Sequence, residues 1–214
     1  MSLREKKAAK TKLAILDSSL ALMKAKPFEA VAVTEICEKA EVSYATFFNY
    51  FEKKEDVLLY YVQLWSVDMA HRAAQAGGGL AGIAEVFEFT GGECEKGPEV
   101  MEEIVAYMAR GRNIARLSIA PLSETEKKLR YPHIQDFTGL GDTGLQSIFP
   151  RLITQAVERG ELPQGTDVND VTLALAAIFM GMPVALSTVR MRGLAGAYRR
   201  QLSMLWGGLQ SPKK

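Results

Sequence analysis

Apolar residues recur along most of the chain at spacings of three and four positions, the period of an amphipathic helix. Leu13, Leu16 and Leu20 form the first such stripe, and Pro27 closes the helix that carries them. No segment alternates apolar and polar residues over a useful length, so the pattern predicts an all-α fold. Helices are predicted over residues 4–26, 34–40, 44–50, 54–75, 80–90, from Pro98 onward, 142–158, 167–192 and 194–206.

Glycine and proline mark the expected breaks between these helices. Three glycines at 77–79 stop the fourth helix, and residues 91–97, which include Cys94, are predicted to form a loop. Residues 111–141 are the least regular part of the pattern. Asp142 or Thr143 is expected to cap the next helix, Gly160 to end it, and Asp167 or Asn169 to begin the one after.

One apolar segment is long enough to suggest a membrane span. Residues 171–189 contain no charged side chain, but glycine, proline, threonine and serine interrupt them and charged residues flank them. A helix that is apolar on every side can equally be buried between other helices or between subunits. In a chain with this composition we expect the buried helix and no membrane span.

Charge is nearly balanced, which narrows the function classes. The chain has 214 residues, 26 lysines and arginines against 25 acids, and 48% hydrophobic residues. Bulk charge therefore cannot drive nucleic-acid binding, although the run of Arg4, Lys6, Lys7, Lys10 and Lys12 is locally basic and is either a solvated helix end or a phosphate-binding segment. The N-terminus lacks the apolar core of a signal peptide, so we expect a cytoplasmic protein.

The two short helices at 34–40 and 44–50 predict a helix-turn-helix. Each is too short to be stable alone, and a tight turn at Glu41–Val42 joins them. Ser43 is a good N-cap for the second helix. That helix presents short or flat polar groups without an acid, as a helix in the major groove of DNA does.

This stretch resembles the DNA-binding domain of the tetracycline-repressor (TetR) family of transcriptional regulators. The residues that carry the resemblance are Phe28, Ala30, Val33, Ile36, Val42, Ser43, Thr46, Phe47, Phe48, Asn49, Tyr50, Phe51, Lys54 and Glu55. The resemblance implies a three-helix DNA-binding domain over 1–52 and a larger helical domain over 53–214. It also implies a homodimer that pairs through its last two helices, binds double-stranded operator DNA with a palindromic sequence, and responds to a small-molecule effector.

The resemblance assigns roles to individual residues. Tyr44 and Ala45 stand where family members touch base edges, and Thr46, Asn49 and Tyr50 where they touch phosphate or sugar. Lys54 is expected to begin the next helix and to face a phosphate. The full predicted DNA-binding set is Thr34, Ser43, Tyr44, Ala45, Thr46, Asn49, Tyr50 and Lys54.

Two residues depart from the family pattern. Glu41 stands where the family has the turn glycine, and a non-glycine residue at positive φ costs about 1 kcal/mol. Ala32 stands where a threonine or serine caps the first motif helix, and Thr34 is expected to cap it instead.

Methionine and aromatic residues in the second domain are either plain core or the lining of an adaptable apolar cavity. In the family such a cavity holds the inducer. The candidate ligand-binding residues are Tyr61, Trp65, Met101, Tyr107 and Met108.

No residue pattern predicts an enzyme, a cofactor or a metal site. His71 and His133 lack the partners of a catalytic or metal site, and the glycine pattern at 139–144 lacks the preceding strand of a dinucleotide site. The sequence leaves one other function class open, a helical protein-interaction or architectural DNA-binding module without an effector.

Overall fold

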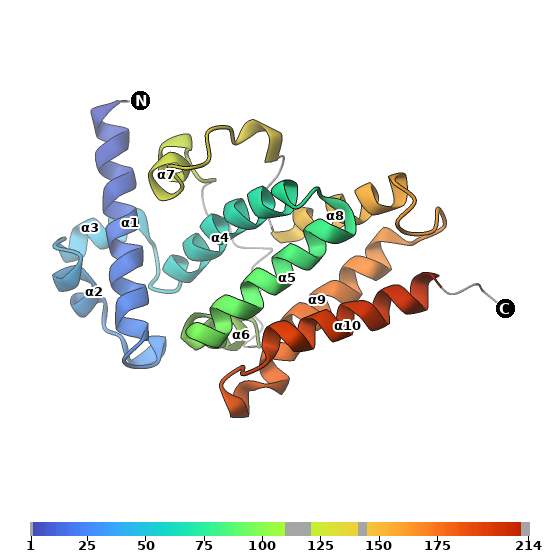
Figure 1. Cartoon of the computed structure of the whole chain (residues 1–214). Helices are drawn as coiled ribbons and strands as arrows, with labels where there is room; N and C mark the ends of the chain where they lie inside the picture. The colour runs from blue at the N-terminus through green and yellow to red at the C-terminus, as the bar shows by residue number, and fades with distance from the viewer. Residues whose placement is uncertain (1, 110–120, 141–144, 211–214) are drawn as a thin grey trace. The chain divides into compact units, whose positions relative to one another are not determined.

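Every regular element in the described part of the chain is a helix (Figure 1). The computed structural model describes residues 2–109, 121–140 and 145–210. The all-α prediction is confirmed. The α-helices are α1 (Leu3–Met23), α2 (Val33–Lys39), α3 (Tyr44–Tyr50), α4 (Asp56–Gln75), α5 (Gly79–Lys96), α6 (Glu99–Ala109), α7 (Glu124–Arg130), α8 (Leu145–Glu158), α9 (Val168–Ala185) and α10 (Leu194–Gln210). Single 3-10 turns lie at Phe28–Ala30 (η1), Thr138–Leu140 (η3) and Ser187–Val189 (η4).

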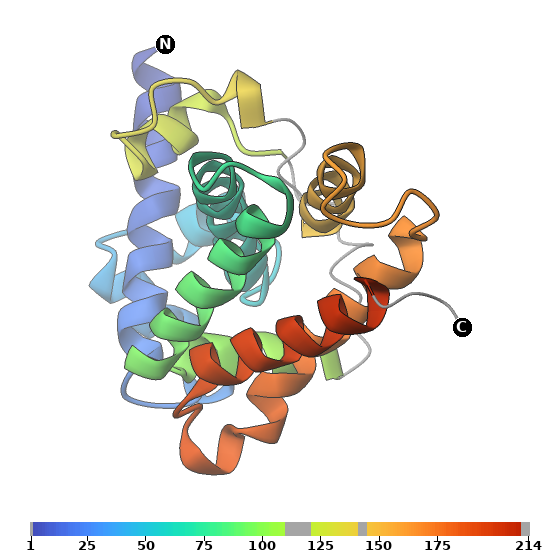
Figure 2. The ribbon, with the colours of Figure 1, turned by 45° about the vertical axis from the view of Figure 1, so that its right-hand side comes forward.

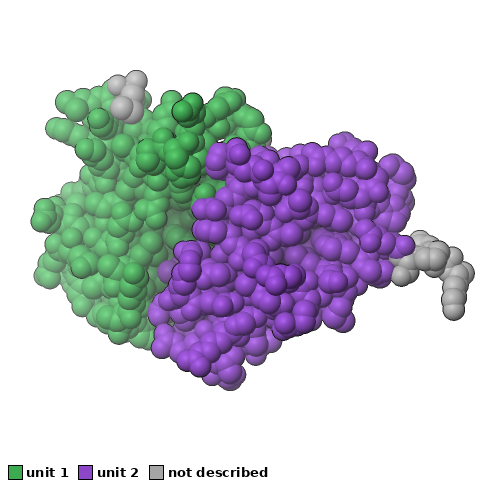
Figure 3. All heavy atoms as spheres, viewed as in Figure 1, with its two compact units in different colours: residues 1–68, 106–141 green, residues 69–105, 142–214 purple. Residues whose placement is uncertain are grey.

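The chain forms two compact units, and each is made of two separate stretches (Figure 3). Unit 1 holds residues 1–68 and 106–141, and unit 2 holds residues 69–105 and 142–214. These boundaries differ from the predicted functional division at residue 52. Unit 1 contains α1, α2 and α3 together with the first part of α4 and the later segment that includes α7.

Unit 1 is built on the apolar face of α1. Ile15 and Leu16 are fully buried, and Ile36 of α2 and Phe47 of α3 are buried in the same unit. The Ser2 hydroxyl accepts the Glu5 N–H and the Glu5 carboxylate accepts the Ser2 N–H, so a capping box begins α1. Helices α1, α2 and α3 therefore all contribute buried apolar side chains to unit 1, although α2 and α3 have only seven residues each.

Helix α7 packs on α1 through two ion pairs. The Lys12 ammonium pairs with the Glu126 carboxylate, and Arg130 donates to Asp17 over 2.9 Å. The Tyr131 hydroxyl donates to the Leu64 carbonyl of α4 at 2.8 Å. The prediction that residues 111–141 are irregular is wrong for 124–130, where the Ser123 cap and the partners on α1 stabilise a short helix.

Unit 2 centres on α5, which packs against α8 and α10, while α9 packs against both of these (Figure 2). The ring of Phe87 lies within 5.6 Å, centroid to centroid, of the rings of Phe149, Phe179 and Tyr198. The Tyr198 hydroxyl donates to the Phe179 carbonyl at 2.6 Å, so this aromatic core also satisfies its buried polar group.

The predicted loop at 91–97 is instead the end of α5, which runs to Lys96. Glycine disfavours a helix by about 1 kcal/mol, but here tertiary contacts override that preference. A Cβ at Gly91 would lie 2.7 Å from the Ala195 Cα, so glycine permits α10 to approach. The Glu95 carboxylate accepts the Ala195 N–H, and Glu88 accepts from Arg199.

The apolar helix α9 is shorter than predicted. The Asp167 carboxylate caps it as expected, but it ends at Ala185, and Arg190 and Met191 adopt positive φ after η4. The predicted cap at Asp142 or Thr143 lies outside the described residues. Helix α9 is long and apolar enough to cross a membrane, but a single helix of this kind is weak evidence for a span. Only 22% of the helix is buried, so the expected burial is not supplied by the rest of this chain.

Candidate DNA-binding site

The turn between α2 and α3 is tight and strained at one residue. Glu41 has φ of 55°, so the predicted left-handed conformation at this non-glycine position is confirmed. The Val42 N–H donates to the Cys37 carbonyl at 3.0 Å and closes the turn. The Ser43 hydroxyl accepts the Thr46 N–H at 3.1 Å, as the predicted N-cap of α3 requires.

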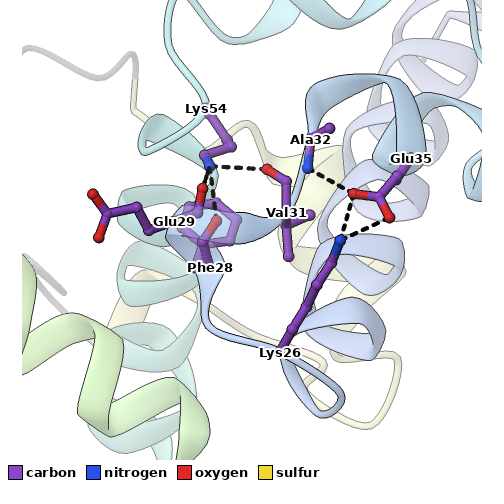
Figure 4. Close-up of polar contacts among 7 residues, drawn as sticks. All are labelled: Lys26, Phe28, Glu29, Val31, Ala32, Glu35 and Lys54. Atoms are coloured by element: carbon purple, nitrogen blue, oxygen red, sulfur yellow. Dashed lines mark hydrogen bonds and ion pairs between the residues drawn. The ribbon is translucent and has the colours of Figure 1, made fainter.

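Helix α2 begins without a side-chain hydroxyl at its N-cap. Ala32 occupies that position and Thr34 lies inside the helix, so the prediction that Thr34 caps α2 is wrong. The Glu35 carboxylate accepts the Ala32 N–H at 2.8 Å and binds the Lys26 ammonium at 2.7 Å (Figure 4). These donors hold the pKa of Glu35 below its usual value, with Lys26 as the largest cause.

Helix α3 presents an exposed face without an acidic side chain. Phe47 is fully buried and anchors the helix, whereas Tyr44, Ala45 and Asn49 are exposed. Thr46 and Tyr50 are half-buried, and the Thr46 and Ser43 hydroxyl oxygens lie 2.8 Å apart. The predicted DNA-contacting side chains of α3 are therefore exposed or half-buried, whereas Phe47 points into the core.

Phe48 belongs with this exposed surface, although it was predicted only as part of the family motif. Its ring is 4.8 Å from that of Tyr44, centroid to centroid, and 38% of the residue is exposed. The signal in the sequence is the spacing of four residues between the two aromatic side chains, which places them on one face of the helix.

The predicted DNA contact Lys54, and Lys12 of the N-terminal basic run, have other partners in the structure. The prediction that Lys54 begins the next helix is wrong, because α4 begins at Asp56. The Lys54 ammonium donates to the backbone carbonyls of η1 (Figure 4). Lys12 pairs with Glu126, so the basic segment available at the N-terminus consists of Arg4, Lys6, Lys7 and Lys10.

The predicted effector residues lie on two helices. Tyr61 and Trp65 are half-buried on α4, and Met101 and Tyr107 are buried on α6, while Met108 is 40% exposed. Met101 belongs to unit 2 and the other four to unit 1. Their role in effector binding stays a prediction. Among the described residues, no group of histidine, cysteine and acidic side chains is placed to hold a metal ion.

Comparison with known proteins confirms the resemblance stated from the sequence. Residues 15–61, which contain α2 and α3, match the family model of the bacterial regulatory proteins, tetR family. No curated protein sequence gave a significant match.

Three solved structures share the fold over nearly the whole chain. FadR from Thermus thermophilus, a TetR-family transcriptional repressor in complex with lauroyl-CoA, is 18% identical with a TM-score of 0.65, over 95% of this chain and 97% of that one. A putative TetR-family regulator from Syntrophomonas wolfei is 16% identical with a TM-score of 0.64, over 95% and 98%. The fatty acid degradation regulator FadR from Bacillus halodurans is 18% identical with a TM-score of 0.58, over 92% and 98%. At this identity the likeness shows the fold.

Proposed function

We propose that this chain, whose helix-turn-helix matches the tetR family of bacterial regulatory proteins, is a ligand-responsive transcriptional repressor that acts in the cytoplasm. The observation that carries the proposal is the exposed, acid-free face of α3, held on a buried Phe47 and capped by Ser43. A helix of this kind fits the major groove, where Tyr44 and Ala45 would read base edges. Asn49, Tyr50 and Thr46 would bind phosphate or sugar. A palindromic operator follows from a symmetric dimer.

The dimer is proposed from the exposed apolar side chains of α9 and α10. Leu173 and Met204 are each about 70% exposed, and Val184 is 55% exposed. Large apolar side chains at this exposure favour a partner surface over solvent. Two copies of α9 and α10 would form a four-helix interface and would have to set the two copies of α3 about 34–36 Å apart, one turn of DNA.

A small, largely apolar effector is proposed to release the operator. The T. thermophilus neighbour binds lauroyl-CoA, which supports an effector with an apolar chain for this fold. Tyr61, Trp65, Met101, Tyr107 and Met108 are the candidate contacts. An effector shifts DNA affinity only by its preference for the conformation that does not fit the operator.

The second candidate is an interaction or architectural module without an effector. The unpartnered apolar side chains of α9 and α10 favour it as much as they favour a homodimer. Specific protection of a short palindrome would exclude it, because an architectural protein binds by backbone contacts and deformability.

Selection of bound DNA from a random pool, followed by footprinting, tests the proposal. We expect a short palindrome, and we expect Tyr44→Ala to weaken binding to it by about 1–3 kcal/mol in a gel-shift titration at fixed salt. Tyr44 is 57% exposed, so the variant should stay folded by circular dichroism. Tyr44→Phe is the matched control, which keeps the ring against Phe48 and removes only the hydroxyl. Unchanged affinity in Tyr44→Ala, or failure to select any sequence, would overturn the proposal.

A further inference from the structure

The ammonium of Lys54 sits on three backbone carbonyls. Its nitrogen lies 2.7 Å from the Phe28 oxygen, 3.1 Å from the Glu29 oxygen and 2.9 Å from the Val31 oxygen. An ammonium has three protons and accepts nothing, so these three bonds use its whole donor capacity. The nitrogen also lies 4.9 Å from the centroid of the Phe28 ring, on which a cation is favourably placed. Figure 4 shows the carbonyls converging on this one atom.

The carbonyls belong to the connection that leads from α1 into α2. Phe28 is 3% exposed and Val31 is 1% exposed, so the connection is anchored in the core by its side chains. At its other end, Lys26 and the Ala32 N–H both bind the Glu35 carboxylate. The segment 26–35 is therefore fixed at two points, once by a local ion pair and once by a residue from beyond α3.

Lys54 closes a loop around the whole helix-turn-helix. The bond to Phe28 joins residues 26 positions apart, and α2, the Glu41 turn and α3 all lie between them. Glu41 is strained at φ of 55°, so the turn alone does not favour the observed angle between α2 and α3. A cross-link at the base of the motif limits the alternative arrangements of the two helices.

We propose that Lys54 is a positioning residue for DNA binding, which acts through the carbonyls of Phe28, Glu29 and Val31 and not by contacting a phosphate. The inference rests on the proposed function, because it concerns the presentation of α3 to an operator. A phosphate contact would require the ammonium to leave at least one carbonyl. The residues that touch the DNA are then those of α3 and the N-terminal basic segment, with Lys54 holding α3 in place.

The salt dependence of operator binding distinguishes the two roles. Each phosphate contact contributes about 0.9 to the slope of log affinity against log salt concentration. We expect Lys54→Met to lower operator affinity by about tenfold or more at every salt concentration, with the slope that the matched control Lys53→Met shows. Lys53 is the exposed neighbouring lysine, so its removal reports the general effect of losing one charge there. Because both protomers of the proposed dimer lose the side chain, a slope that falls by about 1.8 more in Lys54→Met than in Lys53→Met, or about 0.9 for each half-site, would overturn the proposal.

Lys54→Arg provides a second variant that keeps the charge. A planar guanidinium binds a phosphate well but cannot direct three protons at three converging carbonyls, so we expect arginine not to restore affinity. Wild-type affinity in Lys54→Arg would support the phosphate role and overturn ours.

Amide hydrogen exchange, measured without DNA, completes the test. It reports directly on the structure of the motif, so it also applies to a variant that binds DNA poorly because it is partly unfolded. We expect Lys54→Met to lose protection in the peptides covering 28–51 while those of unit 2 stay as in the wild type. Unchanged protection over 28–51 would overturn the proposal. If the wild-type chain selects no DNA, both the proposed function and the role of Lys54 in DNA binding fail. The exchange data would still report whether Lys54 stabilises the helix-turn-helix.

Discussion

Replacing Glu126 by glutamine removes the ion pair that holds α7 against α1. The Glu126 side chain is 7% exposed and that of Lys12 is 15% exposed, so the change leaves a nearly buried ammonium without its counter-charge. Breaking a buried pair by removing one partner costs about 3–5 kcal/mol. The ring of Tyr60, with its centroid 4.3 Å from the ammonium nitrogen, compensates for part of the loss. We therefore expect Glu126→Gln to lower the free energy of unfolding by about 2–4 kcal/mol at pH 7.

The stability lost in Glu126→Gln should depend on pH, and the shifted pKa of Glu126 determines the direction. Burial raises the pKa of Glu126, but the Lys12 ammonium and the Ser123 N–H and hydroxyl outweigh it, so the pKa is lowered overall. The charged form is thus favoured in the folded chain, and its contribution is present above the unfolded pKa of about 4.3. It is lost as the pH falls through the lowered pKa. The difference between wild type and Glu126→Gln should accordingly narrow below about pH 4.

Urea unfolding followed by circular dichroism, at one fixed protein concentration, measures the effect. Glu124→Gln is the matched control, because Glu124 lies on the same helix, is 62% exposed and pairs with Lys127 three residues on. We expect it to change stability by less than about 0.5 kcal/mol. The double variant with Lys12→Met should recover part of the loss, since no unpaired charge remains. A Glu126→Gln protein as stable as Glu124→Gln, or a double variant in which the two losses simply add, would refute the reasoning.

Three further predictions concern single positions. Gly91→Ala should destabilise the chain by about 1–3 kcal/mol in thermal unfolding, because the new Cβ would meet the backbone of Ala195. Gly92→Ala is the control: there is open space around Gly92, so this change should stabilise α5 by about 0.5–1 kcal/mol. Equal effects of the two substitutions would contradict the packing argument. Glu41→Gly should raise the free energy of unfolding by about 1 kcal/mol as the positive φ loses its penalty, and a lower melting temperature would count against it. Cys94 should resist a thiol reagent in the native protein at pH 8, because burial raises the pKa of its thiol to about 12; rapid native labelling would show that α5 opens there.

Local signals explain what the sequence predicted correctly. Ser43 caps α3 through a bond to the N–H three residues on, and the apolar pattern that buries Phe47 is contained within the same helix. The positive φ of Glu41 was expected because this residue stands where the resembled family has the turn glycine. Interactions of this range depend on neighbouring residues, so a single sequence is enough to predict them.

Interactions between distant residues explain what was missed. Helix α7 is stabilised by partners on α1 more than 110 positions away, and the end of α5 is helical because α10 packs against Gly91. The family resemblance led us to expect Lys54 at the start of a helix and facing a phosphate, but the carbonyls that it binds lie 23 to 26 positions earlier. Nothing near these residues in the sequence indicates such partners.

The partnership of α1 with α7 also sets the time at which unit 1 can be completed during synthesis. Lys12 and Glu126 are 114 positions apart, which a ribosome adding 5–20 residues per second covers in roughly 6–23 s. For that interval the nascent α1 exposes the surface on which α7 later packs. A fragment ending after α4 would remain in this unfinished state permanently, so the DNA-binding helices should be isolated together with residues 121–140 and not as the N-terminal segment alone.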